Sequence, residues 1–322
     1  MTPETTRIAI PLVTNAITGG NDWVTQVTTP RGGRKYELDY LKVGGSESPK
    51  VPSVTSLIHG TIRNPVLENW QKKNVRESLT DNLGQTVTKT MIADAFSTSD
   101  RRAARSAATG NMMHAKIEGI LQGKKIDEGK PDQLKPAVKA FRRWQKEIAG
   151  SWELVGTEMA IAEVCGPPMS IKEQAEAISV HPELGANGFA GTVDAIYRMP
   201  DGGYVVCDWK TTRGASGIYS EHCLQISAYV LGLQSMLHRQ GSFFIPDDGE
   251  TRIPPIRAMV VRFVNDYALD ENGNADPDLD KVFEDRIEIG WVDTSAWGTL
   301  FCSSILLYKT SNLSDTVEKE YI

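Results

Sequence analysis

The sequence predicts an α/β fold, a mixed central β-sheet flanked by helices, with an N-terminal β/helical extension. Apolar runs rich in β-forming residues follow one another between residues 152 and 212, and another follows at 255–264. Helix-period patterns precede these runs and separate the last run from the others. An order of helices, three strands, helix, strand and helix is typical of a sheet covered by helices.

The composition is that of an ordinary water-soluble protein, with 40% hydrophobic and 24% charged residues. No apolar run approaches the length of a membrane span, and residues 1–30 lack the order of a signal peptide. The four cysteines show no C-x-x-C spacing, which argues against a zinc knuckle, an iron–sulfur cluster and a disulfide framework. They are Cys165, Cys207, Cys223 and Cys302. We therefore expect a cytoplasmic protein without a membrane partner.

Charge is unevenly distributed along the chain, whose formal net charge is −6. Residues 101–147 hold 12 Lys and Arg against 5 Asp and Glu, whereas residues 266–322 hold 4 against 13. A basic segment inside an acidic protein suits a face that meets a polyanion. A pair of solvated helices with outward Lys and Arg explains the same counts, and both interpretations stay open.

The first fifty residues differ in pattern from the rest. Short β-like runs at 7–13 and 23–28, with Gly and Pro between them, predict a small β element. Pro52-Ser53 then precedes an apolar run that opens a helix, and an amphipathic helix follows at 65–79. We expect an N-terminal β extension over 1–50 and the main domain over 51–322.

Two basic helices are expected before the main strands. The first spans 100–123, with Asp100 as N-cap and Gly123 as its stop. His114 falls beside its apolar face, where a lone histidine is more often a core residue than a ligand. The second helix spans 131–148, with Pro136 in or near its first turn.

Three carboxylates lie in three consecutive predicted strands, each among apolar neighbours. The strands are expected at 152–162, 189–198 and 203–212, and they carry Glu158, Asp194 and Asp208. A helix at 219–240, a strand at 255–264, an acidic loop at 270–280 and a closing helix at 295–308 complete the predicted order.

Lys210 lies two residues beyond Asp208, so both side chains leave the same face of the strand. An isolated pair of this kind is most often a salt bridge. Three buried carboxylates, however, need a cation to neutralise them, and hard oxygen ligands suit Mg²⁺ or Mn²⁺. A lysine beside such a metal can orient the attacking water, which points to metal-assisted hydrolysis of a phosphodiester.

These residues resemble the motifs of the PD-(D/E)xK nuclease superfamily. They are most similar to its RecB-like branch, which includes phage exonucleases and the mitochondrial genome maintenance exonuclease. The similar segments are Val51-Pro-Ser-Val-Thr55, Gly110-Asn-Met-Met-His114, Thr157-Glu158, Gly191-Thr-Val-Asp194 with Asp208-Trp-Lys210, and Gln225-Ile-Ser-Ala-Tyr229. The resemblance implies a restriction-endonuclease-like core. The cysteines depart from the spacing that holds an iron–sulfur cluster in some members, so no cluster is expected.

The resemblance also implies a role for each matching position. The metal ligands are expected to be His114, Asp194, Asp208 and the carbonyl of Trp209. The catalytic set is Lys210, as base or water-orienting group, with Glu158, Asp208 and Gln225. Contacts with DNA are expected from Tyr229, Thr211, Thr212, Arg102, Arg105, Arg142 and Arg143. Gln225 and Tyr229 share one helix face, so a plain helix-packing pair is the alternative for them.

The expected function is a divalent-metal-dependent DNA exonuclease using Mg²⁺ or Mn²⁺. The resemblance further implies a phage-encoded enzyme for DNA replication, recombination or host DNA degradation. Its partners would be single-stranded DNA or duplex ends, and a single-strand-binding or recombination protein. Two alternatives remain: a structure-specific endonuclease for flaps or branches, and a DNA-end-binding module that has kept the fold and lost catalysis.

Overall fold

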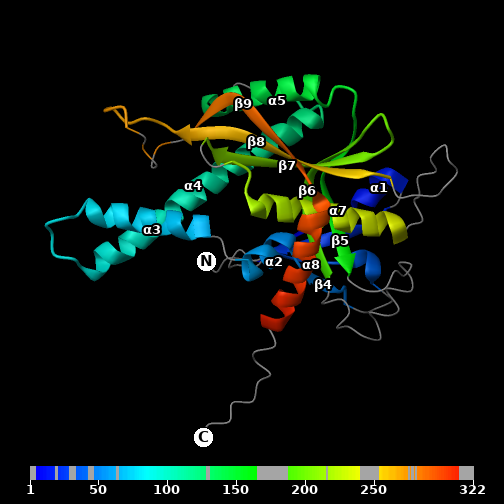
Figure 1. The fold of residues 1–322 in the computed structure, drawn as a ribbon, viewed down its shortest axis with the longest axis horizontal. Coiled ribbons are helices and arrows are strands. Elements are labelled where there is room, and N and C mark those ends of the chain that lie inside the picture. The colour runs from blue at the N-terminus through cyan, green and yellow to red at the C-terminus, as the bar shows by residue number, and fades with distance from the viewer. Residues whose placement is uncertain are drawn as a thin grey trace, which may run out of the picture.

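The central element is a five-stranded sheet of order β5-β6-β7-β8-β9 with helices on both faces (Figure 1). The computed structural model describes residues 5–18, 21–28, 34–42, 47–62, 65–127, 131–164, 188–214, 217–239, 254–274, 276, 279 and 281–311. The strands are β5 (Glu153–Val164), β6 (Gly188–Arg198), β7 (Tyr204–Arg213), β8 (Ile256–Tyr267) and β9 (Lys281–Val292). Only β7 and β8 run parallel; the other neighbouring pairs of this sheet are antiparallel. The mixed α/β fold predicted from the sequence is confirmed.

A second, smaller sheet is built from the N-terminal residues. Its antiparallel strands are β1 (Thr6–Pro11), β2 (Trp23–Thr28), β3 (Arg34–Glu37) and β4 (Lys50–Pro52), with helix α1 (Val13–Thr18) after β1 and a 3₁₀ turn (Asp39–Leu41) after β3. Isolated bridges join Leu12 to Ala160 and Ser53 to Ala190 of the main sheet. One apolar core includes side chains of both sheets, so the small sheet is packed firmly onto the large one. The division of the chain at residue 50 remains a prediction.

The side chains of β7 alternate between two apolar cores, one on each face of the main sheet. Val205, Cys207 and Trp209 enter the core under α4 (Lys89–Leu121) and α5 (Lys135–Glu147). Val206 enters the opposite core, formed by the N-terminal sheet and by α2 (Val54–Thr61), α7 (Ser220–Arg239) and α8 (Thr294–Ser311). The side chain of Asp208 points to the same face as that of Val206. It therefore lies near the end of β7, on the face covered by α7 and the N-terminal sheet.

A helical hairpin projects from the body of the protein (Figure 1). It is formed by α3 (Pro65–Thr80) and the first half of α4. The expected helix start at Asp100 is wrong, because α4 begins at Lys89, with the Thr88 hydroxyl accepting a hydrogen bond from the Met91 N–H at 3.1 Å. The early turns of α4 are largely exposed, and the apolar residues at helical spacing that mark them were overlooked in the sequence: Met91, Ile92, Ala95 and Phe96. Gly123 follows the helix with a φ of 65°, which ends it as expected.

The acidic C-terminal part contains a strand that sequence reasoning missed. β9 pairs antiparallel with β8 and forms one edge of the sheet. It carries charged residues such as Glu284, Asp285 and Arg286, which commonly protect an edge strand against pairing with another chain. Charge thus concealed the strand in the sequence. Within the described ranges, no helix is both long and apolar enough to cross a bilayer.

Candidate active site

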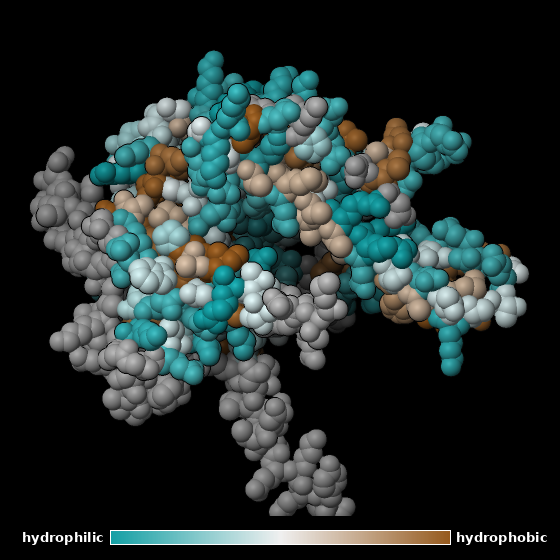
Figure 2. Space-filling view, turned by 180° about the vertical axis from the view of Figure 1, so that it is seen from behind, coloured by the Kyte–Doolittle hydropathy of each residue, from teal (hydrophilic) through white to brown (hydrophobic). Residues whose placement is uncertain are grey.

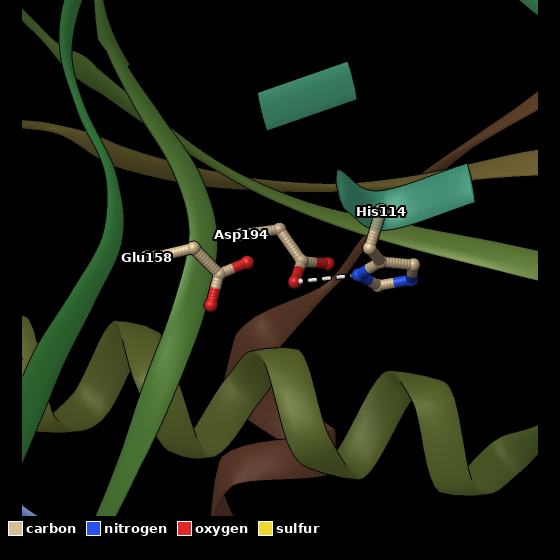
Figure 3. A group of neighbouring side chains, drawn as sticks. All are labelled: His114, Glu158 and Asp194. Atoms are coloured by element: carbon tan, nitrogen blue, oxygen red, sulfur yellow. Dashed lines mark hydrogen bonds and ion pairs between the residues drawn. The ribbon is translucent and has the colours of Figure 1, made fainter. Parts of the chain in front are cut away.

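Three ligand-type side chains from three separate elements meet at one point (Figure 3). His114 comes from α4, Glu158 from β5 and Asp194 from β6, and one donor atom of each lies within 4.8 Å of the others. The His114 Nδ1 lies 3.2 Å from Asp194 Oδ1. The helix therefore delivers a nitrogen donor to two carboxylates that the sheet holds side by side.

The gap that receives these groups opens where β6 and β7 part. Their backbone pairing ends at Ala195 and Cys207. One step further, the Trp209 N–H donates to the Asp194 carboxylate at 2.6 Å, in place of a backbone carbonyl of β6. Because the N–H and C=O of one strand residue point to the same edge, the Trp209 carbonyl is also directed toward this gap.

Asp208 and Lys210 form a close ion pair at the same strand end. The Lys210 Nζ lies 2.7 Å from Oδ1 and 2.6 Å from Oδ2 of Asp208, whose side chain is only 3% exposed. The directed hydrogen bond goes to Oδ1, and the same ammonium lies against the buried Oδ2, so Lys210 meets both oxygens of the carboxylate. A carboxylate oxygen is also the donor type that Mg²⁺ and Mn²⁺ prefer, so Asp208 can contribute to a cation site beside this lysine.

Glu158 adopts a backbone conformation that is unusual for its residue type. Its φ is 50°, and no other non-glycine residue in the described segments has a positive φ. Such a conformation costs about 1–3 kcal/mol and is concentrated at functional sites. Burial, followed by the nearby Asp194 charge, raises the pKa of Glu158 to about 7. Its carboxylate is thus held at a cost in both conformation and charge.

The other ionisable groups of the cluster shift in opposite directions. Burial opposes the charged form of Asp194, but His114, Lys210 and the Trp209 N–H outweigh it and lower its pKa. His114 is likewise opposed by burial, yet the Asp194 carboxylate raises its pKa. Burial raises the pKa of Asp208 to about 6 in spite of Lys210. Without a bound cation, the cluster therefore holds protons to limit its negative charge.

These groups line a cavity of about 390 Å³. Figure 2 shows a hollow on the side from which the hairpin also projects, with hydrophilic residues over much of its rim. The α7 side of the cavity is formed by Gln225, whose Nε2 donates to the Tyr229 hydroxyl at 2.9 Å. Gly191 lets Tyr229 approach, since a Cβ there would lie 2.5 Å from its ring. Both members of the predicted helix pair thus border the site.

The structure does not bring the expected DNA-contacting arginines or threonines to this cavity. Arg102 donates to Asn74 at 2.9 Å on α3, and Arg105 is exposed on the hairpin helix. On α5, Arg142 donates to Gln145 at 3.1 Å and Arg143 to Asp285 at 3.0 Å. Two further positions lie on β7: Thr211 faces Gly110 of α4, and the Thr212 hydroxyl accepts a hydrogen bond from the buried Arg262.

Sequence reasoning assigned no role to several residues of the cavity, among them Arg34, Tyr36, Asn111 and Glu118. Asn111 and Glu118 lie three residues before and four after His114, so helical spacing alone could have placed them on its face. Arg34 and Tyr36 are alternate residues of β3 and share one face of that strand. No sequence signal showed that this face meets the cavity.

The donor set fits a divalent cation such as Mg²⁺ or Mn²⁺. Oxygen donors predominate, and burial raises the pKa of Glu158 and of Asp208, which a bound cation would offset. Three groups are placed to share one ion, namely His114, Glu158 and Asp194, and Asp208 borders the same cavity.

A family model described as the PD-(D/E)XK nuclease superfamily matches residues 55–287. No curated protein matches the sequence. A solved structure titled "Crystal structure of SSO0001" is similar over 76% of this chain and 87% of its own, with 14% identity and a TM-score of 0.26. So low a TM-score carries no weight, and the relationship rests on the family match.

Proposed function

Since this chain belongs to the PD-(D/E)XK nuclease superfamily, we propose that it is a divalent-metal-dependent exonuclease that hydrolyses DNA from its ends. The observation that carries the proposal is the convergence of His114, Glu158 and Asp194 beside the Asp208–Lys210 pair. Superfamily membership implies a metal-dependent nuclease. The preference for DNA ends, a RecB-like relationship and a phage origin are supported by the five sequence motifs between Val51 and Tyr229.

Each residue of the site would have a role that follows from its position. His114, Asp194 and Asp208 would hold the metal together with the Trp209 carbonyl, and Glu158 would complete the acidic set. When bound, the metal supplies a Lewis acid for the phosphoryl oxygen and acidifies a coordinated water. Lys210 would orient the attacking water through its Nζ and stabilise negative charge that builds on the phosphate.

The side chains of α7 that border the cavity would position the DNA and would not take part in the reaction themselves. Gln225 donates to the Tyr229 hydroxyl, so the two side chains hold each other at the border of the cavity. The burial of Tyr229 keeps its hydroxyl protonated, because it raises the phenol pKa further above its usual range. A protonated phenol can donate to a phosphate oxygen, and this supports the proposed DNA contact of Tyr229.

The decisive experiment compares Lys210→Ala and Asp208→Asn with the wild-type protein on end-labelled single strands, duplexes and closed circles with Mg²⁺. Loss of metal-dependent nucleotide release with DNA binding retained is the expected result. Arg257→Ala is the control, because it removes a cation from an exposed ion pair with Asp201, outside the cavity.

Each other outcome assigns a different function. Cleavage of closed circles indicates an endonuclease, and binding of ends by the wild-type protein without any cleavage indicates an inactive end-binding module. Wild-type rates for Lys210→Ala would overturn the assigned chemistry.

A further inference from the structure

We infer that the N-terminal sheet supplies a phosphate-binding subsite for the DNA strand, with Arg34 as its cation. This inference rests on the proposed nuclease function and assigns a role to residues that precede the family match at 55–287. Arg34 and Tyr36 border the same cavity as His114, Asp194 and Lys210. The subsite would take a phosphodiester group of the strand next to the one that is cut.

The wall of the cavity that carries Arg34 is fixed in place. The Tyr36 hydroxyl lies 3.1 Å from the Thr192 hydroxyl, two residues before Asp194 on β6. Ser53, which also borders the cavity, caps α2 and bridges to Ala190 of the same strand. Tyr36 itself is only 2% exposed. The small sheet thus holds Arg34 at a set position relative to the cluster, which is what a subsite requires.

Arg34 has its charge available for a ligand. Among the residues that the structure describes, its guanidinium has no hydrogen-bond or ion-pair partner, although its side chain borders a cavity rich in carboxylates. A guanidinium presents several N–H donors in a planar fork that matches two phosphate oxygens.

The acidic groups alone cannot account for the cavity as a DNA site. Glu118, Glu158, Asp194 and Asp208 all border it, and their charges repel a phosphodiester. A divalent cation neutralises part of this charge at the reacting phosphate, but the next phosphate along the strand needs a cation of its own. Arg34, which lines the cavity from β3, meets that need. At about 390 Å³, the cavity is near the small end of ligand pockets, roughly 300–1,000 Å³.

The test compares Arg34→Ala, Arg34→Lys and Lys35→Ala by steady-state hydrolysis of a labelled single-stranded oligodeoxynucleotide with Mg²⁺ at several salt concentrations. Lys35 is the matched control, because it is the next residue of β3, is exposed, and points to the other face of the strand. We expect Arg34→Ala to raise KM about tenfold with little change in kcat, and Lys35→Ala to leave both unchanged.

The salt dependence of the reaction and the activity of Arg34→Lys distinguish a lost phosphate contact from other causes of a raised KM. A plot of log(kcat/KM) against log[salt] has a negative slope, and loss of one phosphate contact should make that slope less negative by about 0.7 for a single strand. Arg34→Lys should recover part of the lost affinity, since it keeps the charge but not the fork. Circular dichroism of each variant reports whether the small sheet remains folded.

Two results would overturn the inference while leaving the nuclease assignment intact. The first is an unchanged KM and salt slope for Arg34→Ala. The second is a change in the Mg²⁺ concentration needed for activity without a change in KM, which would make Arg34 a counter-charge for the carboxylates. Inactivity of the wild-type protein on every DNA substrate would instead refute the proposed function itself.

Discussion

Replacing Glu158 by Gln should make the metal-free protein more stable above neutral pH. Burial raises the pKa of the wild-type carboxyl from the ordinary glutamate value of 4.5 to about 7 in the folded state. Each pKa unit corresponds to about 1.36 kcal/mol, so the ionised side chain destabilises the folded state by on the order of 3 kcal/mol.

The sign of this effect follows from the direction of the shift. Because the folded-state pKa lies above the unfolded one, the penalty is absent below about pH 4.5, grows as pH rises and is complete above about pH 7. Glutamine keeps the shape and the positive φ of Glu158 but cannot ionise. The variant should therefore match the wild-type protein near pH 4.5 and exceed it in stability at pH 8.

Urea unfolding in a chelator, followed at several pH values, measures the difference in free energy of unfolding. Glu153→Gln is the control, since Glu153 is an exposed glutamate on the same strand. With Mg²⁺ the wild-type protein should become the more stable of the two. A bound cation stabilises the ionised Glu158 carboxylate of the wild-type protein, whereas the neutral amide of the variant binds it more weakly. A constant difference between Glu158→Gln and the wild-type protein from pH 4.5 to pH 8 in chelator would refute the electrostatic reasoning.

Two further predictions concern the metal and the α7 wall. Mg²⁺ should raise the melting temperature of the wild-type protein more at about pH 8 than at about pH 5, because Asp208 and Glu158 must lose their protons to bind it. Thermal scans with and without chelator measure this difference. An equal rise in melting temperature at both pH values would contradict the prediction. Gly191→Ala should cost about 1–3 kcal/mol and lower nuclease activity, because the new Cβ would lie 2.5 Å from the Tyr229 ring. Gly214→Ala is its control, since a Cβ there meets nothing closer than 3.6 Å; equal stability and activity of the two variants would show that the Tyr229 contact is unimportant.

Spacing along single elements was the most informative property of the sequence. Alternation placed Asp208 and Lys210 on one strand face, and the structure brings their charged groups to 2.6 Å. The positions of Glu158 and Asp194 in neighbouring strands indicated that they would meet, because sequential strands usually pair. His114 required more than spacing, since only its similarity to a family motif distinguished it from an ordinary core histidine.

What the sequence could not indicate depended on contacts between distant segments or on charged surfaces. Arg34 lies 80 residues before His114 in the chain, and only the packing of the small sheet brings both to one cavity. β9 was concealed because an edge strand needs charged residues that weaken its apolar pattern. The arginines of α4 and α5 lie outside this cavity, because charge does not specify the direction of a helix face, and their contact with DNA stays a prediction.

The continuity of α4 sets where the chain tolerates insertions and deletions. This helix runs without a break from the hairpin to its end at Leu121, about 50 Å at 1.5 Å per residue. A change of length in the turn at 81–88 alters the hairpin but leaves the helical phase at His114 intact. One residue inserted between Gly110 and His114 would swing the imidazole by about 100° away from Asp194. The hairpin is therefore free to vary in length, whereas the few residues that link Gly110 to His114 must keep their number.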